Sequence, residues 1–491
     1  MSEPYRDTPD QTKKGMPGGV PFIIGNELAE RFSFYGMKGI LKVFMTAHLL
    51  DAAGDSAFMS DNESNAWYHG FTGLAYTTPI LGAMIADIFW GKYKTILYLS
   101  LLYCVGHGCL AMMDVAPAMG MGMKPWLIAG MFFIALGAGA IKPCVSAHVG
   151  DQFGSGNKHL LPQIFNWFYL SINVGAVVAI LLIPQLLNGF KVGTDEATGE
   201  AILFGGPWLA FGLPGVLMAI ATFVFWCGRN KFIHVPPAGW AKWKQETFSP
   251  EGKRALLNLS PLFLLFVPVF WSIFDQTGAA WVAQAQQMDR NVFGWEILPS
   301  QTQFLNPALI LLGVPFFTLI GYPMVSKIYP LTPLRKIGIG FVLTAMSFAL
   351  SAWIESRITA GETPTIWWQV LAYVILTSGE IMVSIVCLEF AYTQSPRKMK
   401  SFIMGVYFLG VALGNYLASG INIGIEATRA EDGSSPLDGS NYYWLFAAMM
   451  AVATVVYIVW TKTYKGETFI QGEEAVEIAE AQAEAQGPDA R

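Results

Sequence analysis

Long hydrophobic segments alternate with short polar segments along almost the whole chain. Each hydrophobic segment is long enough to cross a bilayer as a helix, which takes about 20 residues at roughly 1.5 Å per residue. The pattern predicts twelve spans, at residues 20–50, 64–90, 94–114, 125–150, 161–188, 207–230, 257–286, 302–328, 335–355, 366–394, 401–426 and 441–463. Only 13% of the 491 residues are charged, against about 25% in a soluble domain, so we expect an all-α membrane protein.

The longest basic segment between two predicted spans divides the chain into halves of six spans each. It runs from Arg229 to Arg254 and contains a Pro-Pro pair followed by Trp240 and Trp243. We expect a linker with an amphipathic piece that lies on the membrane surface. The expected units are an N-terminal tail at 1–19, a six-helix bundle at 20–230, the linker at 231–256, a second six-helix bundle at 257–465 and an acidic, solvated tail at 466–491.

The distribution of positive charge orients the spans. With the N-terminus in the cytoplasm, the inner segments hold twenty Lys and Arg residues and the outer loops hold five. We therefore expect a multi-pass protein of the plasma membrane or the bacterial inner membrane, with both termini cytoplasmic. The polar N-terminal residues lead directly into a span, so no cleavable signal peptide is expected. The five cysteines are scattered within apolar segments and indicate neither a disulfide framework nor a metal site.

The first span carries an unusual number of charges. One stripe of this helix, at about 100° per residue, contains Glu27, Glu30, Arg31, Lys38 and Lys42. A charge at the bilayer centre costs roughly 2.5–3.5 kcal/mol, so the stripe must face partners or water inside the protein. An ionisable group within a membrane is by default a functional hypothesis. The alternative is a buried ion-pair network that only holds helices together.

Some of the buried charges lie at the same depth in the membrane when residues are counted from the ends of their spans. Lys142 in span four is level with Glu27 and Glu30, which predicts an ion pair between Lys142 and one of these glutamates. Lys38 in span one is level with Asp275 in span seven. Because these two spans belong to different halves, a Lys38–Asp275 pair would close an outer gate. The alternatives are a helix-packing salt bridge for the first pair and a static clasp for the second.

The second half contributes an isolated acid. Glu380 lies near the middle of span ten, and Ser384 follows on the same face one turn later. The first half offers Arg31, Lys38 and Lys142, so charges of opposite sign would line the two walls of a cavity. A zwitterion with separated ends would fit such a cavity.

Other polar and aromatic residues lie inside the predicted spans. His69, near the outer end of span two, is either a packing residue or a group that titrates on a proton path. The remaining candidates, each of which is individually more typical of packing, are Tyr35, Tyr76, Asn173, Trp271, Asn306 and Tyr407.

Two features indicate the fold. Two six-span halves joined by a cytoplasmic linker resemble the major facilitator architecture. The segment GAMIADIFWGKYK at 82–94 is similar to the loop between helices two and three of that superfamily, where an Asp caps a helix start and pairs with basic residues of a neighbour. We therefore expect the major facilitator fold, with twelve transmembrane helices in two six-helix bundles.

Several segments are typical of one transporter family. ELAERFSFYG at 27–36 resembles the ExxERFxYYG motif of the proton-coupled oligopeptide transporter family, and similar segments such as FWSIFDQTG and LNPALILLGVPFF occur across residues 20–465. Some stretches are closer to animal members, although the large outer domain that those members insert between spans nine and ten is absent here. Lys38 and Phe34 stand where the family usually has Arg and Tyr, and Asp275 and Tyr407 where many bacterial members have Glu and Trp.

The resemblance implies roles for the candidate residues. Those implied in proton coupling are Glu27, Glu30, Arg31, Lys142 and His69. We add Asp275, because its protonation would help to open the outer gate. Glu380 would receive a peptide amino terminus, and Arg31 with Lys142 would serve its carboxylate. The rest of the pocket that the resemblance implies comprises Tyr35, Tyr76, Asn173, Trp271, Asn306 and Tyr407. We add Lys38 because of its depth in span one and Ser384 because it shares a helix face with Glu380.

The resemblance also implies an activity. It indicates a symporter that imports di- and tripeptides with protons by alternating access, and not an enzyme. The alternatives are a proton-coupled carrier of nitrate or another small solute in the same family, which often lacks an intact ExxER motif, and a transporter-like membrane sensor. The expected partners are peptides and peptide-like molecules, protons and the lipid bilayer, with no nucleic acid, metal or organic cofactor.

Overall fold

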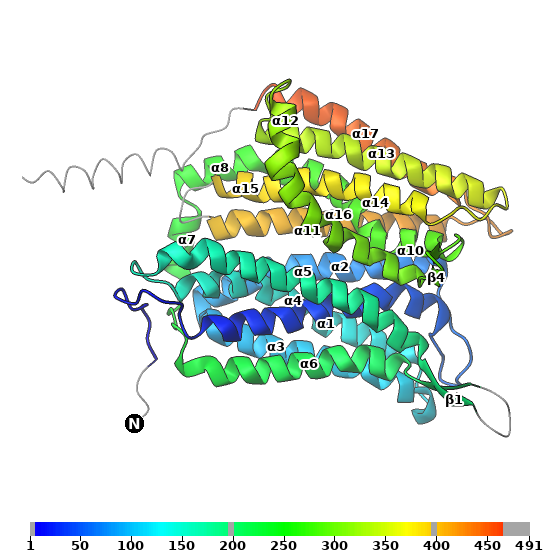
Figure 1. Ribbon diagram of the computed structural model, residues 1–491, viewed down its shortest axis with the longest axis horizontal. Coiled ribbons are helices and arrows are strands. Elements are labelled where there is room, and N and C mark those ends of the chain that lie inside the picture. Colours follow the sequence, from blue (N-terminus) through cyan, green and yellow to red (C-terminus); the bar gives the residue numbers. More distant parts are fainter. Residues whose placement is uncertain (1–4, 195–200, 394–399, 465–491) are drawn as a thin grey trace, which may run out of the picture.

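The computed structural model describes residues 5–194, 201–393 and 400–464, and these residues form a bundle of long, roughly parallel helices (Figure 1). The N-terminal residues and helices α7 (Trp240–Thr247) and α8 (Pro250–Pro261) lie at one end, which we call the terminal side (Figure 1). Two β-hairpins lie at the other end, which we call the hairpin side. The expected acidic tail at 466–491 lies outside the described residues.

Six long helices follow one another in the first half of the chain. They are α1 (Val20–Ala47), α2 (Asp61–Ile85), α3 (Lys92–Ala111), α4 (Met123–Asp151), α5 (Leu161–Asn188) and α6 (Pro207–Cys227). Helix α2 begins at Asp61 because the Ser60 hydroxyl accepts a hydrogen bond from the backbone N–H of Glu63. It ends in a single π-helical stretch, Ala86–Trp90, before Gly91 adopts a positive φ of 73°.

The second half is built from more, and shorter, helices. The continuous ones are α13 (Pro333–Thr359), α16 (Lys400–Ala427) and α17 (Ser440–Thr461). The interrupted spans contain α8, α9 (Val267–Phe274) and α10 (Ala280–Gln286), then α11 (Leu305–Phe316) and α12 (Tyr322–Ser326), then α14 (Trp367–Glu380) and α15 (Val386–Thr393). The hairpins are β1 (Phe190–Thr194) with β2 (Ala201–Phe204), and β3 (Asn291–Val292) with β4 (Trp295–Glu296).

The interruptions lie next to candidate site residues. Asp275 opens a 3₁₀ turn, Asp275–Gly278, that separates α9 from α10. Glu380 ends α14 and is followed by the π-helical stretch Ile381–Ile385. Broken helices and π-bulges are frequent at functional sites, and transporters use them to place backbone groups at a midplane site. The hydrophobic pattern predicted each of these spans as one continuous helix and predicted neither hairpin.

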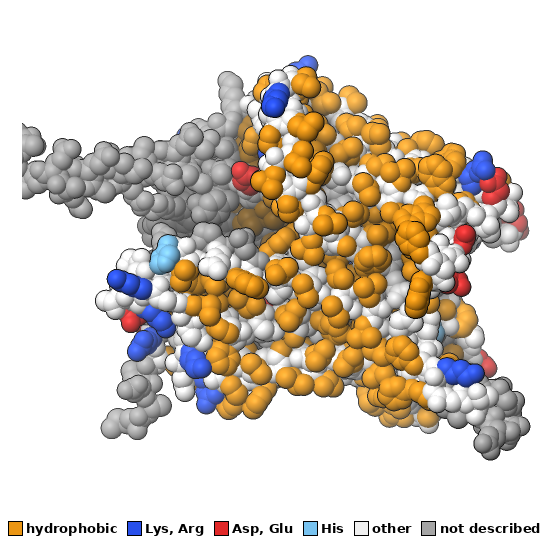
Figure 2. All heavy atoms as spheres, in the orientation of Figure 1, with side chains coloured by type: hydrophobic (Ala, Val, Ile, Leu, Met, Phe, Trp, Pro, Cys, Tyr) orange, Lys and Arg blue, Asp and Glu red, His pale blue; other side chains and the backbone are white. Residues whose placement is uncertain are grey.

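Hydrophobicity and burial agree with a membrane protein. In the described part of the chain, eleven helical segments are long and apolar enough to span a membrane. Helix α1, which corresponds to the first expected span, is 28 residues long and is not among these eleven because of its charges. All five charged side chains of its stripe are buried in the protein, as the sequence predicted. The face shown in Figure 2 is mainly hydrophobic between charged side chains at the two ends.

Glycines allow close approach between α2 and the helices that flank it. A Cβ at Gly73 would lie 2.6 Å from the Tyr416 ring of α16, and a Cβ at Gly82 would overlap the Ala140 carbonyl oxygen of α4. Small residues at such crossings let backbones pack directly. Helix α2 therefore contacts both its own half and α16 of the other half.

Candidate functional site

A central cavity of about 260 Å³ lies between helices of the two halves. Tyr35 and Lys38 of α1 and Asn173 of α5 line it from one half, and Trp271 of α9 and Glu380 of α14 line it from the other. Nine residues predicted from the sequence are in its lining, namely Tyr35, Lys38, Tyr76, Asn173, Trp271, Asp275, Asn306, Glu380 and Ser384. The lining also includes Tyr68, Tyr169 and Gln303, which the sequence analysis did not single out.

The acidic wall of the cavity is Glu380. Its Oε2 accepts a hydrogen bond of 2.6 Å from Asn306 Nδ2, and Asn306 Nδ2 also lies 3.2 Å from Thr377 Oγ1. The Glu380 residue is 9% exposed. A buried carboxylate with a single amide donor is poorly compensated, so it favours a cation or a proton as a further partner.

A buried ion pair joins the two halves at the cavity. Lys38 Nζ lies 2.8 Å from Asp275 Oδ1, which is the contact that the matched depths predicted. The other oxygen, Asp275 Oδ2, accepts a hydrogen bond of 2.8 Å from Asn415 Nδ2 on α16. Asn415 Oδ1 lies 3.0 Å from His69 Nδ1 on α2. The four side chains form one continuous chain of polar contacts between α1, α9–α10, α16 and α2.

Asn415 was missed by the sequence analysis. It lies in GVALGNYLASG of α16, where small and polar residues interrupt the apolar run, and that interruption was the available signal. His69 is fully buried, and its Nε2 has no hydrogen-bond partner among the described residues. A buried imidazole held through one nitrogen leaves the other free for a proton or a water.

The ion pair predicted between Lys142 and Glu27 or Glu30 is wrong for this structure. Arg31 Nε lies 2.6 Å from Glu27 Oε1 and 3.0 Å from Glu30 Oε2, so one guanidinium holds both carboxylates. Arg31 competes well because it shares a helix face with Glu27 at the i, i+4 spacing.

Lys142 instead rests on aromatic rings. Its Nζ lies 4.4 Å from the ring centroid of Phe34 and 4.3 Å from that of Tyr76. These distances are within the range of cation–π contacts. Tyr76 also lines the central cavity, so one ring connects Lys142 with the cavity.

Six predicted residues lie outside the cavity lining, namely Glu27, Glu30, Arg31, His69, Lys142 and Tyr407. Tyr407 is nonetheless linked to the lining, because its hydroxyl lies 3.2 Å from Ser384 Oγ. Tyr76 packs its ring 6.4 Å from that of Trp271, across the two halves. The predicted residues thus line a cavity and, outside its lining, form a group of charged side chains that we call the charged layer, namely Glu27, Glu30, Arg31 and Lys142. In the described residues, no group of three His, Cys, Asp or Glu side chains could hold a metal ion.

Several hydrogen bonds between the halves lie on the hairpin side. Gln303 Nε2 donates to the Gly39 carbonyl at 3.0 Å, and Gln301 Nε2 donates to the Leu181 carbonyl at 2.8 Å. Ser419 Oγ donates to the Ala66 carbonyl at 2.9 Å. Together with the Lys38–Asp275 pair, these contacts join the two halves on the hairpin side of the cavity.

Comparison with known proteins identifies the family. The sequence profile of the POT family matches residues 93–243 and 240–431. Solute carrier family 15 member 2 of Mus musculus is 33% identical over 78% of this chain and 55% of its own length. Peptide transporter 3 of Caenorhabditis elegans is 36% identical over 71% of this chain and 52% of its own length. The chain thus matches about half the length of these curated relatives.

Solved structures match over nearly the whole chain. The crystal structure of an auto-inhibited POT family peptide transporter is 30% identical, with a TM-score of 0.79 over 92% of this chain and 98% of the other. That of the POT family transporter PepTSo is 31% identical, with a TM-score of 0.76 over 92% and 99%. These matches confirm the major facilitator fold and the resemblance that the ELAERFSFYG segment indicated. The chain belongs to the POT family.

Proposed function

We propose that this protein is a proton-coupled symporter that imports di- and tripeptides by alternating access, and not an enzyme. The proposal depends on one observation. A buried carboxylate, Glu380, and a buried ammonium, Lys38, line the same cavity from different halves. A peptide is a zwitterion with separated charged ends, so the two walls complement it. The names of the matched relatives, which are peptide transporters, support the same substrate class.

The amino terminus of the peptide would bind Glu380. An ammonium can donate to this carboxylate while Asn306 holds Oε2, and charge-assisted hydrogen bonds of this kind are about twice as strong as neutral ones. At the other end, the peptide carboxylate would compete with Asp275 for Lys38. Substrate binding would then loosen the contact that closes the hairpin side.

Proton coupling would involve the charged layer behind the cavity. Arg31 serves two carboxylates, Glu27 and Glu30, so protonating one of them leaves a neutral pair between Arg31 and the other. Through Tyr76, the state of this layer would reach the cavity, because the ring contacts Lys142 and also lines the cavity. At the hairpin side, Asn415 contacts His69 through Oδ1 and Asp275 through Nδ2, so a proton gained by either group would change the hydrogen bonding of the other.

The proposed arrangement in the cell follows from the loop charges. The terminal side would face the cytoplasm and the hairpin side the exterior, in the plasma membrane or the bacterial inner membrane. The two six-helix bundles at 20–230 and 257–465 would rock about the cavity. The structure would then represent the state in which the outer side is closed.

Nitrate is the alternative substrate within this family. A buried carboxylate in the cavity wall repels a small inorganic anion, so Glu380 disfavours nitrate. A transporter-like sensor would bind peptide without moving it.

Counterflow experiments distinguish these functions. Vesicles that contain the purified protein are loaded with unlabelled Ala-Ala, with nitrate or with buffer, and are then diluted into labelled Ala-Ala or, in parallel, into labelled nitrate. The proposal expects rapid exchange only into vesicles loaded with Ala-Ala. Exchange of labelled nitrate without peptide exchange favours the anion carrier, and saturable peptide binding without exchange favours the sensor.

A further inference from the structure

A second, larger groove lies on the outside of the helix bundle at the hairpin side. It has a volume of about 720 Å³ and is formed by residues 63–74 of α2, 128–132 of α4 and 419–427 of α16. Its walls are mostly apolar and include Phe132 and Ile423, which are 47% and 58% exposed. Because α2 and α4 belong to one half and α16 to the other, the groove crosses the boundary between the halves.

The depth of the groove matches one leaflet of a bilayer. Its wall on α2 extends from Glu63 to Leu74, which is about 16 Å along a helix. Half of the hydrocarbon core is about 15 Å. A transmembrane helix of another protein would need twice this length, whereas a lipid acyl chain needs only this much. The groove therefore fits an acyl chain.

Charged residues stand only at the hairpin-side end of the groove wall, at the level of lipid headgroups. Lys124 Nζ, at the start of α4, lies 2.7 Å from Glu63 Oε1 and 5.9 Å from the ring centroid of Trp67. Both Glu63 and Trp67 line the groove, and Lys124 is 47% exposed in its side chain. Lys124 can thus reach a lipid phosphate without leaving the groove entrance.

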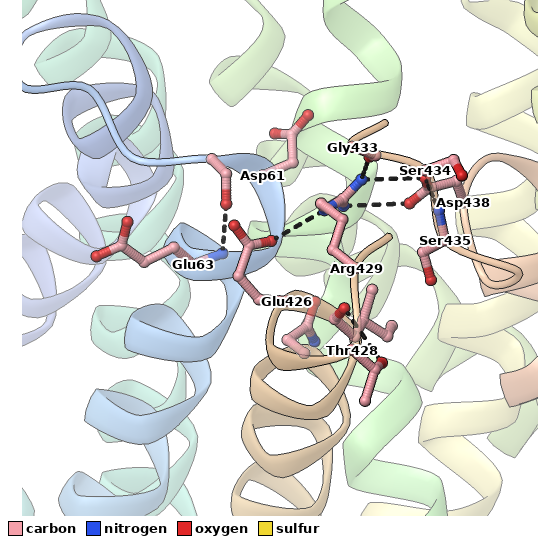
Figure 3. Close-up of polar contacts among 12 residues, drawn as sticks. Asp61, Glu63, Glu426, Thr428, Arg429, Gly433, Ser434, Ser435 and Asp438 are labelled. Atoms are coloured by element: carbon pink, nitrogen blue, oxygen red, sulfur yellow. Dashed lines mark hydrogen bonds and ion pairs between the residues drawn. The ribbon is translucent and has the colours of Figure 1, made fainter. Parts of the chain in front are cut away.

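The same end offers an acceptor that lacks a donor. Glu426 lines the groove, and its Oε2 is shielded from solvent, lies 3.5 Å from Arg429 Nε and receives no hydrogen bond from any described residue. Figure 3 shows the side chains of Asp61, Glu63 and Glu426 gathered where α2 begins and α16 ends. The Glu426 side chain is 39% exposed, so a primary ammonium can donate to its carboxylate, whereas a quaternary ammonium has no N–H group.

The balance of charge at this end selects against anionic lipids. Four carboxylates take part in ion pairs there, namely Asp61, Glu63, Glu426 and Asp438, and the three cations that pair with them are Lys42, Lys124 and Arg429. Within these pairs the carboxylates outnumber the cations, so a zwitterionic headgroup with a primary amine is preferred to phosphatidylserine-like or phosphatidylglycerol-like headgroups.

We propose that this groove binds a phosphatidylethanolamine of the hairpin-side leaflet, with one acyl chain between α2, α4 and α16, its phosphate at Lys124 and its ammonium at Glu426. The floor of the groove includes the Ser419–Ala66 hydrogen bond that joins the halves. A lipid bound there spans both halves on their closed side.

Photolabelling in nanodiscs tests the site. The intact protein is reconstituted with a phosphatidylethanolamine that carries a diazirine in one acyl chain, and in parallel with a phosphatidylcholine of identical chains. After irradiation, labelled peptides are mapped by mass spectrometry. We expect labelling to concentrate in residues 61–74, 123–132 and 419–427, with about tenfold more label from phosphatidylethanolamine, equivalent to about 1.4 kcal/mol. Labelling spread evenly over all lipid-facing helices overturns the site.

Three variants separate the chain site from the headgroup site. Ile423→Trp fills the groove and should reduce its labelling about tenfold. Ile220→Trp on α6 changes an isoleucine of similar exposure, 54%, away from the groove and should leave labelling unchanged. Glu426→Gln should abolish the preference for phosphatidylethanolamine while acyl-chain labelling of the groove persists.

Three results would contradict the proposed lipid site. Unchanged groove labelling in folded Ile423→Trp rejects the acyl-chain site. Equal labelling by the two phospholipids in the unmodified protein rejects the headgroup assignment. A photoactivatable sterol that labels the groove and displaces the phosphatidylethanolamine probe rejects the phospholipid as occupant.

Discussion

Lys38 Nζ and Asp275 Oδ1 lie 2.8 Å apart, and the two residues come from different halves of the protein. Both are buried, with 8% and 5% exposure, so the pair is desolvated. Removing one partner of a buried pair leaves an uncompensated charge, which costs more than the pair itself contributes. We therefore propose the pair as a latch for the hairpin side, which either a proton on Asp275 or a carboxylate at Lys38 would release.

We predict that Lys38→Ala and Asp275→Ala each open the hairpin side. The pair should bias the closed state by about 1–3 kcal/mol, so the ratio of open to closed protein should rise roughly 5–150-fold. The measurement is the distance between spin labels at Ser56→Cys and Glu431→Cys, one on each half, in a cysteine-free background.

The matched control for this latch is Lys42→Ala. Lys42 pairs with Asp61 at 2.7 Å, but both residues belong to the first half, so the distance between the halves should not change. The exchange Lys38→Asp with Asp275→Lys should partly restore closure. If neither single variant lengthens the distance, the pair is a static clasp and the latch lies elsewhere.

We predict that Glu380→Gln weakens the binding of peptides, because the contact with their amino terminus is lost. Loss of a hydrogen bond to a charged group costs about 1.5–3 kcal/mol, so the apparent affinity for Ala-Ala should fall roughly tenfold to hundredfold. An analogue that lacks the amine should lose little. Competition of both compounds against a labelled dipeptide measures the difference, with Glu389→Gln, an exposed glutamate two turns later, as the control. Equal losses for the two compounds reject the assignment.

We predict that Glu30→Gln separates transport from its driving force. In the variant, Arg31 keeps Glu27 as its charged partner in this pair of contacts. Protonation of residue 30 can therefore no longer change the charge of the charged layer. Accumulation of peptide in a proton gradient should stop, whereas exchange of peptide for peptide should continue. Glu296→Gln, at an exposed ion pair with Arg290 in the β3–β4 hairpin, should leave both unchanged. Concentrative uptake by Glu30→Gln at the normal level contradicts this role.

We predict that His69 and Asn415 act as one unit. Asn415 bridges His69 Nδ1 to Asp275 Oδ2, so His69→Phe and Asn415→Val interrupt the same connection. Residues within one network are coupled, and their effects are not additive. The shifts that the single variants cause in the pH dependence of uptake should therefore not add in the double variant. Additive shifts indicate that the two side chains act separately.

The positions of charges predicted much of this site because burying a charge in a membrane is so costly. The stripe on α1 had to face the protein interior, and it does. Matched depth was sufficient to pair Lys38 with Asp275, since α1 and α9 run in the same direction and both residues face the cavity. The same reasoning placed Lys142 with Glu27 or Glu30 and was wrong, because depth carries no information on rotation about the helix axis.

Other features depended on contacts that the sequence does not record. Arg31 competes for Glu27 and Glu30 from their own helix, and the Phe34 and Tyr76 rings offer Lys142 another partner. Asn415 is isolated in the sequence and gains meaning only when α16 is placed against α2 and α9. The breaks at Asp275 and after Glu380 preserve the hydrophobic pattern, so the pattern could not reveal them.

Proton-driven accumulation of a dipeptide tests the central claim most directly. Vesicles with the purified protein and an inside pH one unit above the outside provide about 1.4 kcal/mol per proton, and a potential of 100 mV, inside negative, adds roughly 2.3 kcal/mol. The account predicts that labelled Ala-Ala accumulates well above its external concentration, that the interior acidifies in step, and that a protonophore abolishes both. Accumulation that is unaffected by the protonophore, or internal peptide that never exceeds the external concentration, would contradict it.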